Sequence, residues 1–207
     1  MRAALAAVTI AFSALPSGPA AEEPPARPAF EGFYVGASAA YSAGSARVVF
    51  EGEPGQSLTL NGAALGGFAG YGRRHESLLL AAEIDGAYAT AEDSATMGFG
   101  DLRLETRAIL GASAIAGIVV DERLLFYGRA GYRAVVLRGD APGTRFTDAA
   151  HGPSIGAGVA LAIGERVMLR LEGRNSFLAD RRYSAGGTTL TVDPDEVAVG
   201  LGLALRF

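Results

Sequence analysis

Arginine and carboxylate residues recur at alternate positions in several short segments of this 207-residue chain. Alternate side chains of an extended strand point to the same face, so these residues would line one surface of a sheet. Once enclosed, such a surface forms salt bridges and charge-assisted hydrogen bonds. We predict an ionic network whose members are Glu83, Asp85, Arg103, Glu105, Arg107, Arg129, Arg133, Arg170, Glu172, Arg174 and Arg206.

Residues suited to catalysis or metal binding are few. The absence of cysteine from the sequence excludes thiolate zinc sites and cysteine nucleophiles. Of the two histidines, His75 falls in a predicted turn, and His151 precedes Ser154 by three positions, so alternation aims that pair at opposite faces. The acidic run at 193–196 could hold a divalent cation but has no ligand-spacing signature. We therefore predict no enzymatic activity, no cofactor and no metal site.

Composition narrows the class of protein. Hydrophobic residues make up 49% of the chain and charged residues 19%, which is too apolar for a disordered tail and unusual for a cytosolic enzyme. Glycine is frequent, with 29 residues, but follows no collagen period. The net charge is −4, all basic residues are arginine, and no stretch is basic enough to predict a nucleic-acid partner.

The first residues have the pattern of a secretory signal. Arg2 precedes an uncharged stretch from Ala3 to Leu15, and small residues then allow cleavage after Ala20. The stretch is too short to span a membrane as a helix. We predict a signal peptide at 1–20 and a periplasmic N-terminal linker at 21–31, so that the mature protein leaves the cytoplasm.

The rest of the chain alternates between apolar and polar residues. One parity of each predicted strand is free of charge, and the opposite parity carries all the residues of the proposed network, which indicates a two-faced sheet. The predicted strands are 32–42, 60–72, 78–90, 102–118, 124–138, 153–164, 166–178 and 196–207.

The connections between these strands also alternate in length. Long polar loops are expected at 43–59, 91–101, 139–152 and 179–195, and short turns at 73–77, 119–123 and 164–165. Aromatic residues fall near both ends of the charge-free face: Tyr41, Tyr88, Tyr132 and Phe177 near the long loops, and Phe33, Tyr71, Phe126 and Phe207 near the short turns.

Together these features predict an all-β, eight-stranded, antiparallel, up-and-down transmembrane β-barrel over 32–207. A soluble sandwich is the alternative, with the charged face in solvent. Glycines interleaved with the charged face and the strict alternation of loop lengths disfavour it. A lipocalin-like barrel would need an apolar interior, whereas this interior is polar.

The sequence resembles small outer-membrane β-barrel proteins of Gram-negative bacteria, of the OmpA-type and opacity-protein-type porin-like group. The similarity covers residues 30–207, and two differences are the absence of tryptophan and of a C-terminal peptidoglycan-binding domain. The segments that carry it are EGFYVG at 31–36, EID at 83–85, RAILG at 107–111, LRLEGR at 169–174 and the last strand through Phe207. The resemblance implies localisation in the cell outer membrane and recognition of Phe207, as a C-terminal assembly signal, by the barrel-assembly machinery.

An eight-stranded barrel is just wide enough for side chains to fill its interior. With seven arginines and four carboxylates in the predicted network, we expect a wet lumen that conducts weakly at most and favours small anions. The expected role is structural or porin-like: envelope integrity with minor diffusion of small solutes. The alternative is an adhesin or recognition barrel acting through the loops at 43–59 and 179–195, and a lipid-A-modifying enzyme is the least favoured.

The expected partners are outer-membrane lipid and lipopolysaccharide, and the expected state is a monomer. Arginine suits phosphate groups because its guanidinium binds them in a bidentate manner. Arginines at the predicted outer rim are therefore candidates for lipopolysaccharide contact, and solvated loop charges are the alternative. They are Arg138, Arg145, Arg181 and Arg182.

Overall fold

The computed structural model describes residues 29–50, 56–90, 92–97, 100–141, 144–179, 181–185 and 188–207. These residues form one antiparallel sheet that closes on itself, because β1 pairs with both β2 and β10. They contain no helix long and apolar enough to cross a membrane. The strands are β1 (Gly32–Phe50), β2 (Gln56–His75), β3 (Leu78–Ala89), β4 (Glu92–Met97), β5 (Gly100–Val120), β6 (Leu124–Ala141), β7 (Thr144–Ile163), β8 (Val167–Phe177), β9 (Arg181–Ala185) and β10 (Thr188–Arg206).

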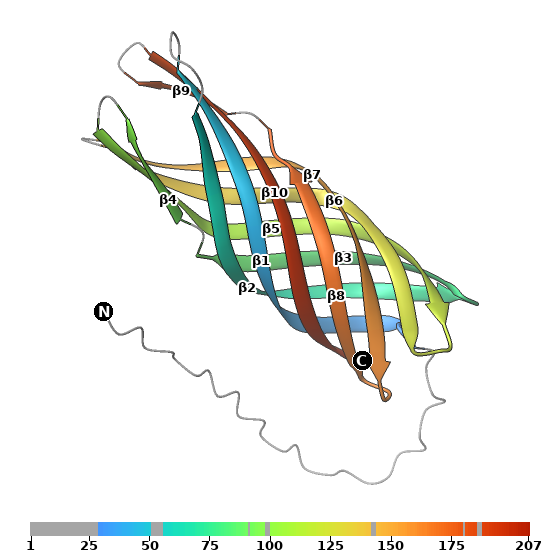
Figure 1. Cartoon of the computed structure of the whole chain (residues 1–207). Helices are drawn as coiled ribbons and strands as arrows, with labels where there is room; N and C mark the ends of the chain where they lie inside the picture. The colour runs from blue at the N-terminus through green and yellow to red at the C-terminus, as the bar shows by residue number, and fades with distance from the viewer. Residues whose placement is uncertain are drawn as a thin grey trace, which may run out of the picture.

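The ten strands make an eight-stranded barrel. β4 pairs with β5 beyond the end of β3, and β9 pairs with β10 beyond the end of β8, so each continues the path of the strand before it. Figure 1 shows β4 and β9 at the end of the barrel opposite the C-terminus. Within the described residues, the predicted eight-stranded, up-and-down, antiparallel barrel is confirmed.

The strands are longer than predicted at the end that carries β4 and β9, which we call the ribbon end. β1 remains paired with β10 as far as Phe50, and β6 and β7 remain paired as far as Ala141 and Thr144. Most of the predicted loops at 43–59 and 139–152 are therefore strand, and those at 91–101 and 179–195 contain β4 and β9. The predicted short turns lie at the opposite end, the turn end, at 76–77, 121–123 and 164–166.

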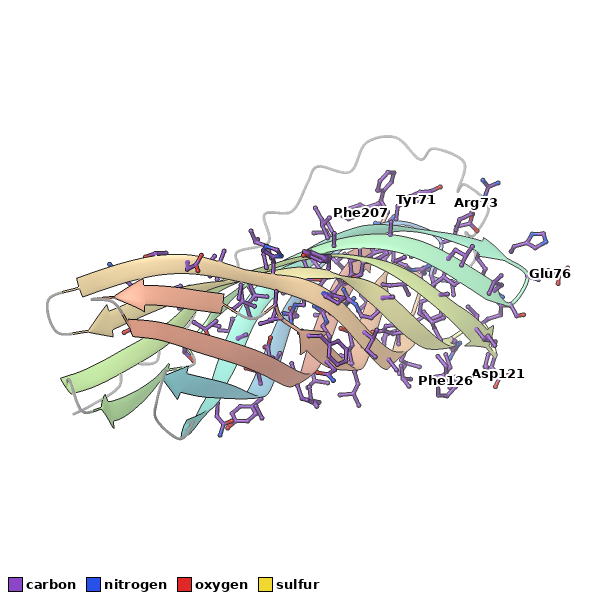
Figure 2. The ribbon with its side chains drawn as sticks, turned by 90° about the horizontal axis from the view of Figure 1, so that it is seen from above. Tyr71, Arg73, Glu76, Asp121, Phe126 and Phe207 are labelled. Carbon is purple, nitrogen blue, oxygen red and sulfur yellow. The ribbon has the colours of Figure 1, made fainter. Side chains whose placement is uncertain are left out.

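The charge-free face is the outer surface of the barrel. Large apolar side chains such as Leu65, Ile84 and Leu201 are more than half exposed there. Figure 2 shows Tyr71, Phe126 and Phe207 projecting from the wall near the turn end, which Glu76 and Asp121 mark. Exposed apolar side chains in this number would be costly in water, so the outer surface requires an apolar surrounding.

The interior of the barrel has an apolar cluster at each end. The turn-end cluster contains Phe30, Leu79, Ile115, Val119, Leu125, Ala160, Ala162 and Met168 together with Tyr34, Phe68, Tyr127 and Ala204. The ribbon-end cluster contains Ala64, Ala89, Ile109, Val135, Ala150 and Leu178. Phe30 is only 2% exposed, so this last part of the predicted linker at 21–31 belongs to the barrel. The signal peptide predicted at 1–20 lies outside the described residues.

Candidate functional site

The candidate site is an ionic layer between the two apolar clusters. On β3, the inward-facing residues run from Leu79 through Glu83 and Asp85 to Ala89. The same order of apolar, charged and apolar residues occurs on β6 and β8. Alternation of a strand places these side chains on one face, and closure of the barrel brings the faces together. The members of the layer are Glu83, Asp85, Arg129, Arg133, Arg170, Glu172, Arg174 and Glu196.

Arg129 lies at the centre of the layer, and its side chain is 2% exposed. Nη1 donates to Glu83 Oε1 at 3.2 Å and to Glu172 Oε1 at 2.8 Å, while Nη2 donates to Asp85 Oδ1 at 3.0 Å. Nη2 also donates to Ser113 Oγ at 2.7 Å. One guanidinium thus holds three carboxylates from β3 and β8, and each contact is a charge-assisted hydrogen bond.

The two β8 arginines complete the pairing of these carboxylates. Arg170 Nη1 donates to Glu83 Oε2 at 2.7 Å, and its guanidinium carbon lies 3.5 Å from the centre of the Phe68 ring. Arg174 donates through Nη1 to Asp85 Oδ2 at 3.1 Å and through Nη2 to Glu172 Oε1 at 2.8 Å. The stacking of Arg170 on an aromatic face adds a cation–π contact to its ion pair.

Glu196 is a member of the layer in addition to the residues predicted from the sequence. Its Oε2 accepts a hydrogen bond from Arg133 Nη1 at 3.3 Å, and Arg133 also donates to Ser176 Oγ at 3.1 Å. The signal was present in the sequence, since the outward parity of Val197 and Val199 places Glu196 on the inner face. Of the acidic run at 193–196, the structure describes the side chain of Glu196 and places it against Arg133, and the side chains of Asp193 and Asp195 lie outside the described residues.

Among the described side chains, this layer is electrically balanced. Four arginines, 129, 133, 170 and 174, face the four carboxylates 83, 85, 172 and 196. The expectation of a lumen that favours small anions depended on unpaired arginines. Because the layer has no net charge, that expectation loses its basis.

Tyrosine hydroxyl groups add further hydrogen bonds to carboxylate oxygens that the arginines already contact. Tyr34 Oη donates to Glu83 Oε2 at 3.0 Å, and Tyr127 Oη donates to Glu172 Oε2 at 2.8 Å. Each tyrosine lies beside a glycine on the neighbouring strand, since Tyr34 is opposite Gly70 and Tyr127 is opposite Gly158. These glycines leave the space into which the tyrosine rings lean.

A small cavity adjoins the layer on the β1 and β10 side. It has a volume of about 70 Å³, and Arg133, Arg174 and Glu196 line it together with small residues of β1 and β10. A cavity of this size with several polar groups can hold a few water molecules. Water molecules in this cavity would hydrate the ionic layer.

Two predicted members of the network lie elsewhere because β5 contains a β-bulge. The register with β6 shifts between Thr106 and Ala108, so Arg107 has no partner on β6. The Arg107 side chain is 44% exposed and pairs with Glu105 at 3.0 Å. The prediction that Glu105 and Arg107 line the lumen is therefore wrong, because alternation cannot continue through an inserted residue. Arg103 follows the same shifted register, but its side chain lies outside the described residues.

Arg206 lies inside the barrel but apart from the ionic layer. It is buried at the turn end, where Nη2 donates to the backbone carbonyl of Glu165 in the β7–β8 turn. Arg206 also lines a small pocket with Phe30 and Met168 of the turn-end cluster. Its position indicates that it helps to close the turn end.

The arginines proposed for lipopolysaccharide contact are described only in part. Arg138 is half-buried, and its cross-strand partner on β5 is Glu105. The side chains of Arg145, Arg181 and Arg182 lie outside the described residues.

The two histidines do not assemble a catalytic group in the described part of the chain. His151 is exposed on the outer surface, where its Nδ1 lies 2.5 Å from Tyr132 Oη, whereas Ser154 is buried on the inner side. His75 is exposed at the end of β2. No group of three histidine, cysteine, aspartate or glutamate side chains that could hold a metal ion occurs among the described residues.

One ion pair joins two of the short turns. Both terminal nitrogens of Arg74, at the end of β2, donate to the Glu122 carboxylate in the β5–β6 turn, and Nε donates to the Glu76 carbonyl. The hydrogen bonds from Arg74 hold the pKa of the Glu122 carboxyl below its usual range. This contact is present while Glu122 is ionised and is lost as the pH falls through that lowered pKa.

Comparison with solved structures finds barrels of similar architecture. Neisserial surface protein A (NspA) is 20% identical with a TM-score of 0.54, and the match covers 86% of this chain and 98% of NspA. OprG of Pseudomonas aeruginosa is 9% identical with a TM-score of 0.57, and the match covers 86% of this chain and 96% of OprG. At these identities the likeness shows the fold alone.

No curated protein sequence is similar enough to this chain to count as a match. A family of outer-membrane proteins, in contrast, matches almost the whole sequence. Its description is "outer membrane protein beta-barrel domain", and the match runs from residue 4 to residue 207. The closed barrel with an apolar outer surface and an ionic interior agrees with that description. The chain belongs to the outer-membrane β-barrel domain family, and its location is the outer membrane.

Proposed function

We propose that this protein is a structural barrel that contributes to envelope integrity and is closed to solutes. The observation that carries the proposal is that the ionic layer lies between two apolar clusters along the interior of the barrel. An ion moving along the lumen would have to break paired charges and then cross apolar packing at both ends. Both steps are costly because charges lose hydration in a dry interior.

The orientation and export of the chain are part of the proposal. Outer-membrane barrels have short periplasmic turns and longer extracellular connections. By that rule the turn end faces the periplasm and the ribbon end faces the outside. The charged residue and apolar stretch within residues 1–20 support export through a signal peptide cleaved after Ala20.

Conductance across a planar lipid bilayer tests whether the lumen is closed. The purified protein, folded in detergent and inserted from concentrated potassium chloride, is expected to give no discrete current steps, because neither the ionic layer nor the apolar clusters leave a path. A large porin inserted in the same way is the positive control. Reproducible single-channel steps from the wild-type protein would contradict the proposal and favour a diffusion role.

The proposed role also has a cellular test. A strain lacking the protein is expected to become more sensitive to detergent, and the wild-type gene is expected to restore resistance.

A second candidate function is recognition at the cell surface, and the length of the strands favours it. Crossing a membrane takes about 9–11 residues of a tilted strand. In β1 the residues between the aromatic positions Phe33 and Tyr41 fill that length, yet the strand remains paired with β10 as far as Phe50. The ribbon end thus projects beyond the membrane. Loss of surface binding with envelope integrity retained, on shortening these ribbons, would favour this candidate.

Two further expectations concern the assembly of the protein: its insertion into the membrane and its oligomeric state. Phe207 is 66% exposed on the outer wall, and its backbone nitrogen donates to the Phe33 carbonyl at 2.9 Å. We propose that the barrel-assembly machinery reads this terminal aromatic residue during insertion, as the resemblance implies. The balanced ionic layer and the closed sheet support a monomer, because the barrel leaves no open strand edge within the membrane-spanning wall.

A further inference from the structure

The β-bulge of β5 changes which side chains reach the outer wall at the ribbon end. On the turn side of the bulge, even-numbered residues such as Leu110 face outward, whereas Ile109 is buried. On the ribbon side, Glu105 is paired with Arg138, which shares the outward parity of Tyr132 on β6. Uninterrupted alternation would place Glu105 in the interior, but because of the inserted residue it lies on the outer surface.

Glu105, Arg107 and Arg138 lie directly beyond the exposed aromatic residues near the ribbon end of the outer wall. Tyr88 is 57% exposed on the outer wall, and its cross-strand partner on β5 is Ala108, the residue next to Arg107. Aromatic residues at the ends of a barrel wall lie at the level of the lipid headgroups. Arg107 and Arg138 are thus expected at the depth of the headgroup phosphates of the outer leaflet.

The chemistry of the group is suited to a phosphate. Arg107 is 44% exposed and forms an ion pair with Glu105, and Arg138 is the residue opposite Glu105 on β6. Glu92 of β4 is the cross-strand partner of Glu105 on its other side, so the site depends on the two guanidiniums themselves and not on a net positive charge of the wall. A guanidinium can bind two phosphate oxygens at once while it keeps a contact to a neighbouring carboxylate.

We propose that Arg107 and Arg138 form a binding site for the phosphate of a phosphorylated glycolipid, of the lipid A type, in the outer leaflet. The site rests on the proposed orientation of the barrel in the outer membrane, and it deepens the expected contact with lipopolysaccharide. Glu105 holds Arg107 against the wall, and the bulge presents both guanidiniums to the lipid rather than to the lumen.

Lipid retention by the folded protein tests this site. The full barrel is equilibrated with vesicles of phosphatidylcholine containing bisphosphorylated lipid A, and bound lipid A is counted by native mass spectrometry. Arg107→Gln and Arg138→Gln are each expected to lower retention about fivefold, the effect of one basic residue at a charged lipid surface, and the double variant more. Lipid A without phosphates is expected to be retained weakly by every variant.

Arg73→Gln is the matched control, because Arg73 is an exposed arginine of β2 on the outer wall at the opposite end, labelled in Figure 2. Equal retention by the wild type and the double variant, or an equal loss in Arg73→Gln, would overturn the proposal. Displacement of lipid A by millimolar inorganic phosphate would assign the site to free phosphate and would also overturn it. A gel that compares boiled and unboiled protein shows whether each variant is folded, and a conducting but lipid-binding barrel would contradict only the proposed closed lumen.

Discussion

Replacement of Arg129 with glutamine is expected to remove most of the stability of the folded barrel. The side chain is 2% exposed and is the common partner of Glu83, Asp85 and Glu172. Without the guanidinium, the buried carboxylates exceed the remaining arginines by one charge. Breaking a buried ion pair by removing one partner costs about 3–5 kcal/mol, and here three carboxylates lose a partner. Urea unfolding of the protein in lipid vesicles measures the free energy of unfolding.

Two further variants separate the loss of charge balance from other effects. Arg73→Gln removes an exposed arginine and is expected to leave the free energy of unfolding nearly unchanged. Adding Glu172→Gln to Arg129→Gln restores equal numbers of positive and negative charges in the ionic layer. The double variant should therefore be more stable than the sum of the two single losses indicates. If the effects of the two substitutions simply add, the carboxylates do not depend on Arg129 for compensation.

Much of this ionic layer could be predicted from alternation alone. Glu83, Asp85 and Arg129 lie on strands that contact lipid on one face and the enclosed interior on the other. A strand in that position must keep a period of two, since a one-residue slip would expose a charge to lipid. The same constraint explains why the charge-free parity of the sequence coincides with the exposed apolar surface.

The bulge at Arg107 could not be predicted from this pattern. Parity counting assumes that every residue of β5 has a partner on β6, and the register shift between Thr106 and Ala108 breaks that assumption. The residues around the bulge are an ordinary alternation of charged and apolar types. Only the pairing with β6 shows that Glu105 opposes Arg138 on the outer wall.

The strands of the ribbon end could not be predicted, for a different physical reason. Above the membrane both faces of a strand can meet water, so residues 43–50 need no apolar alternation and resemble a loop. Phe30 lies in the segment predicted as a linker, and its burial depends on distant residues such as Leu79 and Met168. Local sequence does not record such contacts between segments far apart in the chain.

Substitution of Gly158 with alanine is expected to destabilise the barrel through Tyr127. A Cβ atom at Gly158 would lie 2.5 Å from Tyr127 Oη and 2.7 Å from the Leu171 carbonyl oxygen. The tyrosine is already buried in the turn-end cluster and donates to Glu172 at 2.8 Å, so it cannot move aside without losing that hydrogen bond. Overpacking together with the lost bond to a charged acceptor is expected to cost about 3 kcal/mol, measured by urea unfolding in vesicles.

Gly173→Ala is the matched control on β8. Gly173 lies on the outer surface directly opposite Ala157, the neighbour of Gly158, and a Cβ atom there would meet no atom within 4 Å. This variant is expected to unfold at nearly the urea concentration of the wild type. In a Tyr127→Ala background, Gly158→Ala should lose the part of its effect that comes from displacing the ring, whereas the contact with the Leu171 carbonyl oxygen remains. An equal cost of Gly158→Ala in both backgrounds would show that the strand backbone, and not the tyrosine over the glycine, sets the space available inside the wall.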